Sequence, residues 1–469
     1  MRNRSPGNPA KDYAADRRRK KGVDPVQNRD YRVEPTGTAP PEERAALIGV
    51  GMDGRADDAE LPVFDELAEL ARTAGARVVL RFYQRKANPE SSSYLGSGKM
   101  QELAKEVKDT GATLVIADDD LSPAQVRHLE EATCVRVIDR SELIIDIFAK
   151  QARTEQAKLQ VELAQLQYLA PRLKRMWTHL SRITGAGGIG SRGPGEKQIE
   201  VDRRLVKKKI EDLKAKLDVI EARKVREVKA RRDAFKVALV GYTNAGKSTM
   251  MNALTGADVF VADRLFATLD TRTRRLELED GSSVLLSDTV GFIDKLPHHL
   301  VASFHATLAE VTGADLLLHV VDASDDAAVS KIGCVRDVLG KIGAGSIPEL
   351  VLLNKADRVT DLARLSALRA SLGEHLVVSA LTGEGLPALK ARVRDAASEF
   401  EDVVTLEMPA GDGALLARLE RSAVVHDRSY DDERVVIRAS LPRIHRHHFE
   451  AWITSPKPRR RRRPPPDHQ

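Results

Sequence analysis

Cysteine is scarce in this chain of 469 residues, which holds only Cys134 and Cys334, far apart and without a metal-ligand neighbourhood. Neither a disulfide framework nor a zinc site is therefore indicated, and a reducing compartment is expected. No apolar run approaches the roughly 20 residues of a membrane-spanning helix. The basic N-terminus also lacks the apolar core of a signal peptide. We expect a cytoplasmic protein with no membrane insertion.

Aromatic residues make up only 4% of the chain, whereas 31% of it is charged, with a net charge of +6. The basic residues are clustered, above all in Arg17–Lys21 and Arg459–Arg463, which favours a polyanionic partner. Both clusters lie in segments with little to bury, so residues 1–44 and 456–469 read as a disordered basic arm and a disordered basic tail. Whether these tails contact nucleic acid or only aid solubility stays open.

One glycine-rich stretch organises the rest of the chain. It fits the pattern G-x-x-x-x-G-K-[ST] and follows an apolar run, Phe235 to Val240, that is typical of a buried strand. Backbone N–H groups in such a loop bind phosphate oxygens, the lysine reaches the terminal phosphates, and the serine can ligate Mg²⁺. The predicted nucleotide-binding residues here are Gly241, Tyr242, Thr243, Asn244, Ala245, Gly246, Lys247, Ser248 and Thr249.

Further motifs follow the expected strands of a doubly wound sheet. Asp288-Thr289-Val290-Gly291 can supply a magnesium ligand in Asp288 and a phosphate-sensing N–H in Gly291. The next motif contains Asn354, Lys355 and Asp357, and its aspartate can accept from the ring N–H and the amine of guanine. Ser379 and Ala380 can complete the base pocket. Four motifs in this order predict a GTPase that uses GTP as substrate and Mg²⁺ as cofactor.

The switch I segment must lie between the phosphate loop and Asp288. We select Thr268 as its magnesium ligand, with Thr271 and Thr273 as alternatives, so that the predicted metal ligands are Ser248, Thr268 and Asp288. The residue after Gly291 is Phe292, where many small GTPases place a water-orienting glutamine. We therefore expect hydrolysis to be slow without a partner. The predicted catalytic residues are Lys247, Thr268, Asp288 and Gly291.

The N-terminal half alternates strand-like and helix-like stretches and then becomes strongly helical. Apolar residues at spacings of 4 and 3 predict two long antiparallel helices, around Leu159–Leu166 and Val206–Ile220. The stretch between them, Thr184–Lys197, is too glycine-rich for helix and reads as a flexible cationic hairpin tip. Basic residues on the second helix, with no aromatic platform, favour recognition of RNA backbone and shape.

Gly96–Lys99 resembles a clipped phosphate loop, so a second nucleotide site there is a minor hypothesis.

The predicted fold is therefore a multidomain α/β protein with a small C-terminal α/β appendage. In that appendage we expect strand, helix, strand and helix at 403–408, 414–425, 434–439 and 444–452. The boundaries are a basic arm at 1–44, an N-terminal α/β domain at 45–140, a helical hairpin at 141–233 with its glycine-rich loop at 184–197, a GTPase domain at 234–400, a small C-terminal α/β domain at 401–455 and a basic tail at 456–469.

Four longer motifs, Tyr94–Lys99, Gln160–Leu166, Gly190–Gln198 and Asp288–Ile293, closely resemble the HflX family of ribosome-associated GTPases, in the Obg-HflX superfamily. The resemblance runs from about residue 46 to 400 and covers Phe292. Asp270-Thr271-Arg272-Thr273 departs from it, because similar proteins often place a proline after the aspartate, and this leaves the switch I register open.

The resemblance implies a hairpin loop that reaches the large ribosomal subunit and its RNA near the peptidyl-transferase centre. It also implies splitting of stalled or idle ribosomes in the GTP state and hydrolysis stimulated by the ribosome. We expect a monomer that does not bind DNA. Alternatives from other classes are a nucleotide-gated RNA-binding factor in subunit assembly or dormancy, and ATP-driven RNA remodelling through the N-terminal domain. The residues that the resemblance assigns to ribosome binding are Gly187, Gly188, Gly190, Arg192, Gly193, Pro194 and Gly195.

Overall fold

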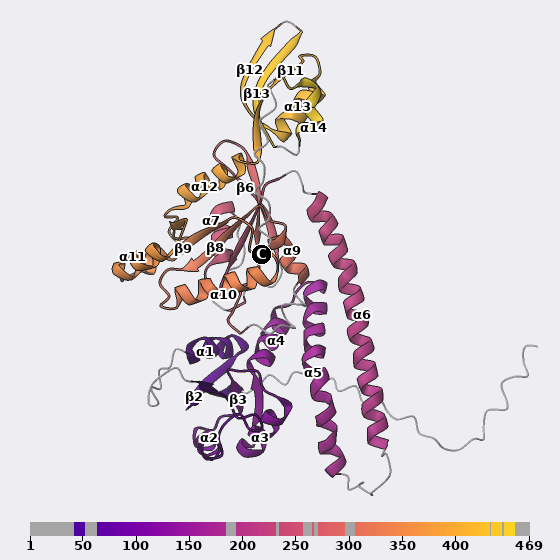
Figure 1. The fold of residues 1–469 in the computed structure, drawn as a ribbon, viewed down its shortest axis with the longest axis vertical. Coiled ribbons are helices and arrows are strands. Elements are labelled where there is room, and N and C mark those ends of the chain that lie inside the picture. Colours follow the sequence, from indigo (N-terminus) through magenta and orange to yellow (C-terminus); the bar gives the residue numbers. More distant parts are fainter. Residues whose placement is uncertain are drawn as a thin grey trace, which may run out of the picture. The chain divides into compact units, whose positions relative to one another are not determined.

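The computed structural model describes residues 42–51, 63–183, 194–230, 234–256, 265–266, 271–295, 305–431, 433–442 and 445–454. The two basic termini, most of the glycine-rich hairpin tip and the switch I residue Thr268 lie outside the described residues. The described residues include three β-sheets and a long helical hairpin (Figure 1).

The first sheet forms the N-terminal α/β domain. Its strands run parallel in the order β2-β1-β3-β4, and helices connect them. The continuous apolar run in β1 suits a strand that is buried on both faces. Local signals also define the helices, since Ser122 and Gln125 form a capping box at the start of α3. The elements are β1 (Glu43–Gly51), α1 (Val63–Ala74), β2 (Ala76–Arg85), α2 (Ser97–Thr110), β3 (Leu114–Ala117), α3 (Pro123–Thr133), β4 (Arg136–Asp139) and α4 (Arg140–Gln151).

Two long helices follow, α5 (Glu155–Ile183) and α6 (Pro194–Ala230), and they run side by side in Figure 1. The predicted apolar seam holds them together: Leu163, Leu213 and Leu217 are buried in one cluster, with Leu159, Leu166 and Ile210 packed against it. A salt bridge from Lys209 to Glu162 (2.5 Å) crosses the same contact. The predicted antiparallel hairpin is therefore confirmed, and Pro194 and Gly195 begin its second helix.

The predicted GTPase domain contains a six-stranded sheet in the order β10-β9-β8-β5-β7-β6. All neighbouring strands are parallel except β6, which pairs antiparallel with β7 at one edge. The last strand ends at Val377, and the chain turns at Ser379, whose N–H donates to Glu384 O. The strands are β5 (Lys236–Gly241), β6 (Arg272–Glu277), β7 (Ser283–Asp288), β8 (Leu316–Asp322), β9 (Glu349–Asn354) and β10 (His375–Val377); the helices are α7 (Lys247–Thr255), α9 (His305–Thr312), α10 (Ala328–Lys341), η1 (Ala356–Arg358), α11 (Leu362–Ser371) and α12 (Leu386–Ser398).

The C-terminal domain differs from its predicted element order. The helix predicted over 414–425 ends at Ser422, and the next residues form a third strand, paired antiparallel with β13 in a sheet of order β11-β13-β12. Pairing with β13 overrides the local apolar pattern that favoured a longer helix. Within the helix predicted over 444–452, the structure has an α-helix over Arg446–Phe449 and a 3-10 turn over Glu450–Trp452, after which Ile453 bridges to Leu406. The elements are β11 (Glu401–Pro409), α13 (Gly413–Ser422), β12 (Val424–Asp431), β13 (Arg434–Pro442), α14 (Arg446–Phe449) and η2 (Glu450–Trp452).

Apolar residues close both faces of the main sheets. One cluster joins β5, α7 and α12 and includes Leu239, Met250 and Leu389. Another joins the N-terminal domain to residues of the GTPase domain and is described below. None of the helices in the described ranges is long and apolar enough to span a bilayer.

Candidate active site

The glycine-rich loop connects β5 to α7, as predicted. Two of its glycines are required by close packing, because a Cβ at Gly241 would collide with Val320 O and one at Gly246 (φ +95°) with Asn354 Nδ2. Asn244 also adopts a positive φ of 61°. This backbone turns the loop around the N-terminus of α7, where helix N–H groups favour an anion.

Lys247 is buried at the first position of α7. Its ammonium donates to Tyr242 O (2.8 Å) and Gly241 O (3.1 Å), which holds the side chain along the inside of the loop. Burial lowers the pKa of Lys247 to about 8, although the charge of Asp288 opposes the shift. The lysine therefore remains mostly protonated at neutral pH and can bind phosphate.

Two side chains with oxygen atoms that can ligate a metal lie beside the start of α7. Ser248 Oγ donates to Asp288 Oδ2 over 2.7 Å, and Asp288 is 1% exposed at the end of β7. A hydroxyl and a carboxylate are donors that Mg²⁺ prefers, so this pair fits a magnesium ion. The third predicted ligand, Thr268, lies outside the described residues. Of its two alternatives, Thr273 is on β6, where its hydroxyl lies 3.0 Å from Ser287 Oγ.

The segment after Asp288 is attached to the phosphate loop by backbone hydrogen bonds. The Thr243 N–H donates to Phe292 O (2.7 Å), and the Phe292 N–H donates to Gly241 O (3.1 Å). Gly291 packs so closely there that a Cβ would lie 2.8 Å from Thr243 Cα and 3.0 Å from Lys247 Nζ. A side chain at position 291 would collide with the phosphate loop, so the close approach of the two segments requires glycine.

The Asn354–Asp357 motif joins three loops at the other end of the site. Asn354 Nδ2 donates to Ala245 O (2.9 Å), and its Oδ1 accepts from the Ala380 N–H (3.0 Å). Asp357 is exposed on η1, where the Ser379 hydroxyl donates to its carboxylate over 2.5 Å. All the predicted base-pocket residues therefore meet at the carboxyl ends of β9 and β10, where nucleotides bind in doubly wound sheets.

Lys355 has a left-handed backbone (φ 60°), and its ammonium pairs with Asp322 at the end of β8 (2.7 Å). Burial raises the pKa of Asp322, but hydrogen bonds from Lys355 and Ser324 outweigh it and hold this pKa below its usual range. Asp322 is therefore ionised at neutral pH and fixes the lysine of the motif.

A cavity of about 680 Å³ lies beside the phosphate loop and has an unexpected acidic wall. One side of the cavity consists of phosphate-loop residues, the end of β8 and Lys355. Four acidic residues of the N-terminal domain line it as well, and sequence reasoning missed them: Asp65, Glu66, Glu69 and Asp118. The only available signal was Asp118-Asp119-Asp120, a run of carboxylates directly after the buried strand β3.

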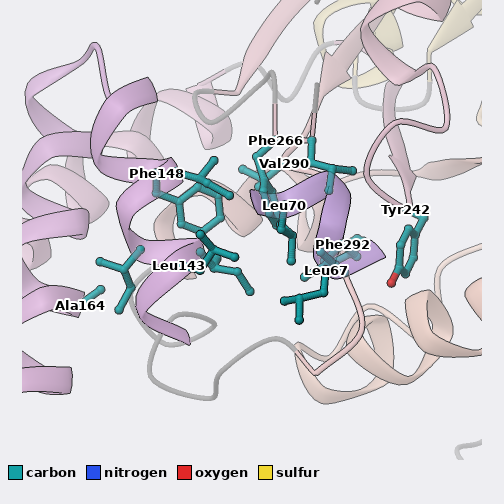
Figure 2. Close-up of a cluster of buried hydrophobic side chains, with 14 of the residues drawn as sticks. Leu67, Leu70, Leu143, Phe148, Ala164, Tyr242, Phe266, Val290 and Phe292 are labelled. Atoms are coloured by element: carbon teal, nitrogen blue, oxygen red, sulfur yellow. The ribbon is translucent and has the colours of Figure 1, made fainter. Parts of the chain in front are cut away.

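Phe292 packs into a core. It is 3% exposed and lies in a cluster with Leu67, Leu70 and Phe148 (Figure 2). Its ring has no group that can orient water.

In the clipped phosphate loop of the N-terminal domain, Lys99 pairs with Glu102 (2.8 Å) and lies over the Phe82 ring, so its charge is already matched.

A six-stranded nucleotide-binding sheet, a phosphate loop, and the Asp288 and Asn354–Asp357 motifs at strand ends define a P-loop GTPase. Three family descriptions match consecutive parts of the chain: "GTP-binding GTPase N-terminal" at residues 63–149, "GTP-binding GTPase Middle Region" at 151–231 and "50S ribosome-binding GTPase" at 236–355. GTPase HflX from Alkalihalophilus pseudofirmus is 42% identical over 84% of this chain and 92% of its own length. GTPase HflX from Escherichia coli K12 is 43% identical over 85% and 94%. The chain belongs to the HflX family of GTPases.

Among solved structures, the crystal structure of SsGBP with GDP covers 76% of this chain and 99% of that chain at 24% identity, with a TM-score of 0.43.

Proposed function

We propose that this protein is a GTP hydrolase that binds the large ribosomal subunit and, in its GTP state, splits stalled or idle ribosomes. Family membership supports the hydrolase activity, and the match of residues 236–355 to a 50S ribosome-binding GTPase supports the large subunit and its RNA as partner. A protein that works on ribosomes would act in the cytoplasm.

Within this proposal, the loop from Gly241 to Thr249 holds the phosphates and Asp357 selects guanine. Ser248 and Asp288 would hold Mg²⁺, which supplies charge neutralisation on the phosphate oxygens when bound. Lys247 places a second positive charge at the same phosphates. The Asn354 amide fixes the distance between the phosphate loop and the base pocket, because it bonds to both.

Slow hydrolysis in isolation is also part of the proposal. Catalysis of phosphoryl transfer depends on orienting the attacking water and on stabilising charge. The buried ring of Phe292 does neither, and it is held in the cluster with Leu67 and Leu70. The missing contribution would then come from the ribosome.

The observation that carries the proposal is the position of the helical hairpin. Its second helix, α6, ends at Ala230, and the strand that leads into the phosphate loop begins at Lys236. Cations on this helix are exposed and suit contact with RNA phosphates. They are Arg203, Arg204, Lys207, Lys208, Lys214, Lys216, Arg223 and Arg226.

Splitting can be measured directly by sucrose-gradient profiles of monosomes incubated with the protein and a non-hydrolysable GTP analogue. We expect monosomes to separate into subunits with the analogue and to remain intact with GDP. The variant Lys247→Ala, which lacks the phosphate-binding ammonium, serves as the inactive control. Intact monosomes with GTP and with the analogue would contradict splitting and favour a binding factor in assembly or dormancy.

A further inference from the structure

The segment that follows Gly291 is attached to the N-terminal domain through its backbone. The N–H of Asp294 donates to the Tyr242 hydroxyl (2.7 Å), and its carbonyl accepts from Arg140 of α4 (3.1 Å). Tyr242 in turn donates to Glu66 of α1, and Arg140 pairs with Glu66 as well. The backbone N–H and carbonyl of Asp294 are thus both bound by a buried network, which consists of Tyr242 from the phosphate loop and Arg140 and Glu66 from the N-terminal domain.

Lys295 makes the second attachment. Its ammonium lies 2.6 Å from Asp118 Oδ2 and 2.8 Å from Asp119 Oδ1, at the carboxyl end of β3. Arg140 donates to the other oxygen of Asp118 (2.8 Å), so the carboxylate bridges two cations. Lys295 also has a left-handed backbone with φ 51°. A lysine adopts this conformation at a cost, and it persists where surrounding contacts hold it.

Apolar packing reinforces the attachment for both switch segments. Phe266, two residues before Thr268, is 2% exposed, and its ring lies edge-on against Phe148 of α4, with centroids 4.6 Å apart. Gln151 donates to the carbonyl of Leu265 (3.3 Å). Figure 2 shows Phe266, Val290 and Phe292 gathered with residues of the N-terminal domain.

These contacts of Asp294 and Lys295 resist the movement of Gly291 that a bound terminal phosphate of GTP requires. The phosphate must contact Lys247 and the N–H of Gly291 together, yet Gly291 packs directly on Thr243 and beside Lys247. A phosphate placed between them requires Gly291 to move away from Thr243. Asp294 and Lys295 lie three and four residues further on, so this movement strains the bonds to Tyr242, Arg140 and Asp118. GDP, which lacks the terminal phosphate, makes no such demand.

We propose that Arg140 and Lys295 are positioning residues that hold switch II across the terminal-phosphate position, so that GTP binding and docking of the N-terminal domain oppose each other. The coupling between domain docking and GTP binding acts equally in both directions. A substitution that weakens the contacts of Arg140 or Lys295 with switch II therefore raises the affinity for GTP. The inference concerns nucleotide binding by the isolated protein and holds whether or not the protein splits ribosomes.

The test is the variant Lys295→Ala in the full chain, with binding of GDP and of a non-hydrolysable GTP analogue measured by titration. We expect affinity for the analogue to rise about fivefold, the lower end of measured allosteric couplings, and affinity for GDP to stay unchanged. Lys295→Arg, which keeps both ion pairs, should restore the behaviour of the unmodified protein. Lys86→Ala is the matched control, because Lys86 pairs with Glu90 at similar exposure within the N-terminal domain.

A double-mutant cycle with Asp118→Asn separates positioning from a general loss of structure. If Lys295 acts through Asp118, the two substitutions together should raise analogue affinity by less than the product of their separate effects. Equal changes for both nucleotides, a fall or no change in analogue affinity, or the same change in Lys86→Ala would overturn the proposal. Nucleotide binding without ribosomes is the readout, so failure here is distinct from failure of the splitting activity.

Discussion

Asp357, the residue that we propose to select guanine, is held in place by its neighbours. The Ser379 hydroxyl donates to one of its oxygens (2.5 Å), and that hydroxyl itself accepts from the Thr382 N–H (3.2 Å). The side chain is therefore oriented before a base arrives. A fixed acceptor discriminates well, because a base without the matching donors leaves it unpaired.

We predict that Asp357→Asn weakens GTP binding about 100-fold, since charge-assisted hydrogen bonds to guanine contribute about 1.5–3 kcal/mol each. The amide can instead donate to the carbonyl that xanthine carries in place of the guanine amine. Binding of xanthosine triphosphate should therefore improve in the same variant. Competition titrations measure both nucleotides.

Asp361→Asn is a suitable control for this change. Asp361 lies nearby but caps α11, a role that asparagine fills as well. Its binding of both nucleotides should match that of the unmodified protein. Equal weakening of GTP and xanthosine triphosphate in Asp357→Asn would show that the residue does not read the base.

At the scale of elements, the helical hairpin depends on a short apolar seam. Leu213 is 3% exposed and packs with Leu163 and Leu217, whereas Leu205 on the same helix is 61% exposed. Apart from this seam, the side chains of α6 that the structure describes are mostly polar and exposed. Long helices of this kind owe their stability to packing more than to propensity.

We predict that Leu213→Ala lowers the free energy of unfolding of the hairpin by about 2 kcal/mol, the lower end for buried leucines. Hydrogen exchange of α6 amides should accelerate correspondingly. Leu205→Ala, the same substitution at an exposed site, should stay within about 0.5 kcal/mol. Equal acceleration in both variants would mean that the seam does not hold the hairpin.

The C-terminal domain shows what element-level patterns leave undecided. Val424 and Val425 continue the apolar periodicity of α13, but they begin β12 and pair with Ser440 and Ala439. Only the presence of β13 as a partner makes the extended conformation favourable. The parallel strand β5, by contrast, was predictable because burial on both faces gives a continuous apolar run.

At the scale of the whole molecule, packing contacts hold the segment after Asp288 on two sides. Phe292 is enclosed by apolar side chains and Gly291 is packed on the phosphate loop. The Phe292 ring offers no group that could orient a water for attack. An external partner that moves switch II would change both features at once.

We predict that purified large ribosomal subunits raise the GTPase rate at least tenfold over that of the isolated protein. Small subunits at the same concentration are the control and should have little effect. Phosphate release at saturating GTP measures the rate. An isolated protein that turns over as fast as the stimulated one would refute the dependence on the ribosome.

The sequence by itself determined the class of protein and most of the nucleotide site. The phosphate loop, Asp288 and Asn354–Asp357 are short contiguous motifs, and each follows an apolar strand, so their meeting at one sheet edge follows from the fold class. The heptad-like seam likewise predicted the pairing of α5 with α6, because helical periodicity fixes which residues share a face.

Only the tertiary structure decided what surrounds the switch segments. Arg140 and the Asp294 carbonyl are 154 positions apart, and Asp118 and Lys295 are 177 apart. No periodicity or motif relates residues so distant, because their contact arises from the packing of two independently patterned domains. The sequence identified the GTPase site, and the tertiary structure showed which residues of the N-terminal domain hold its switches.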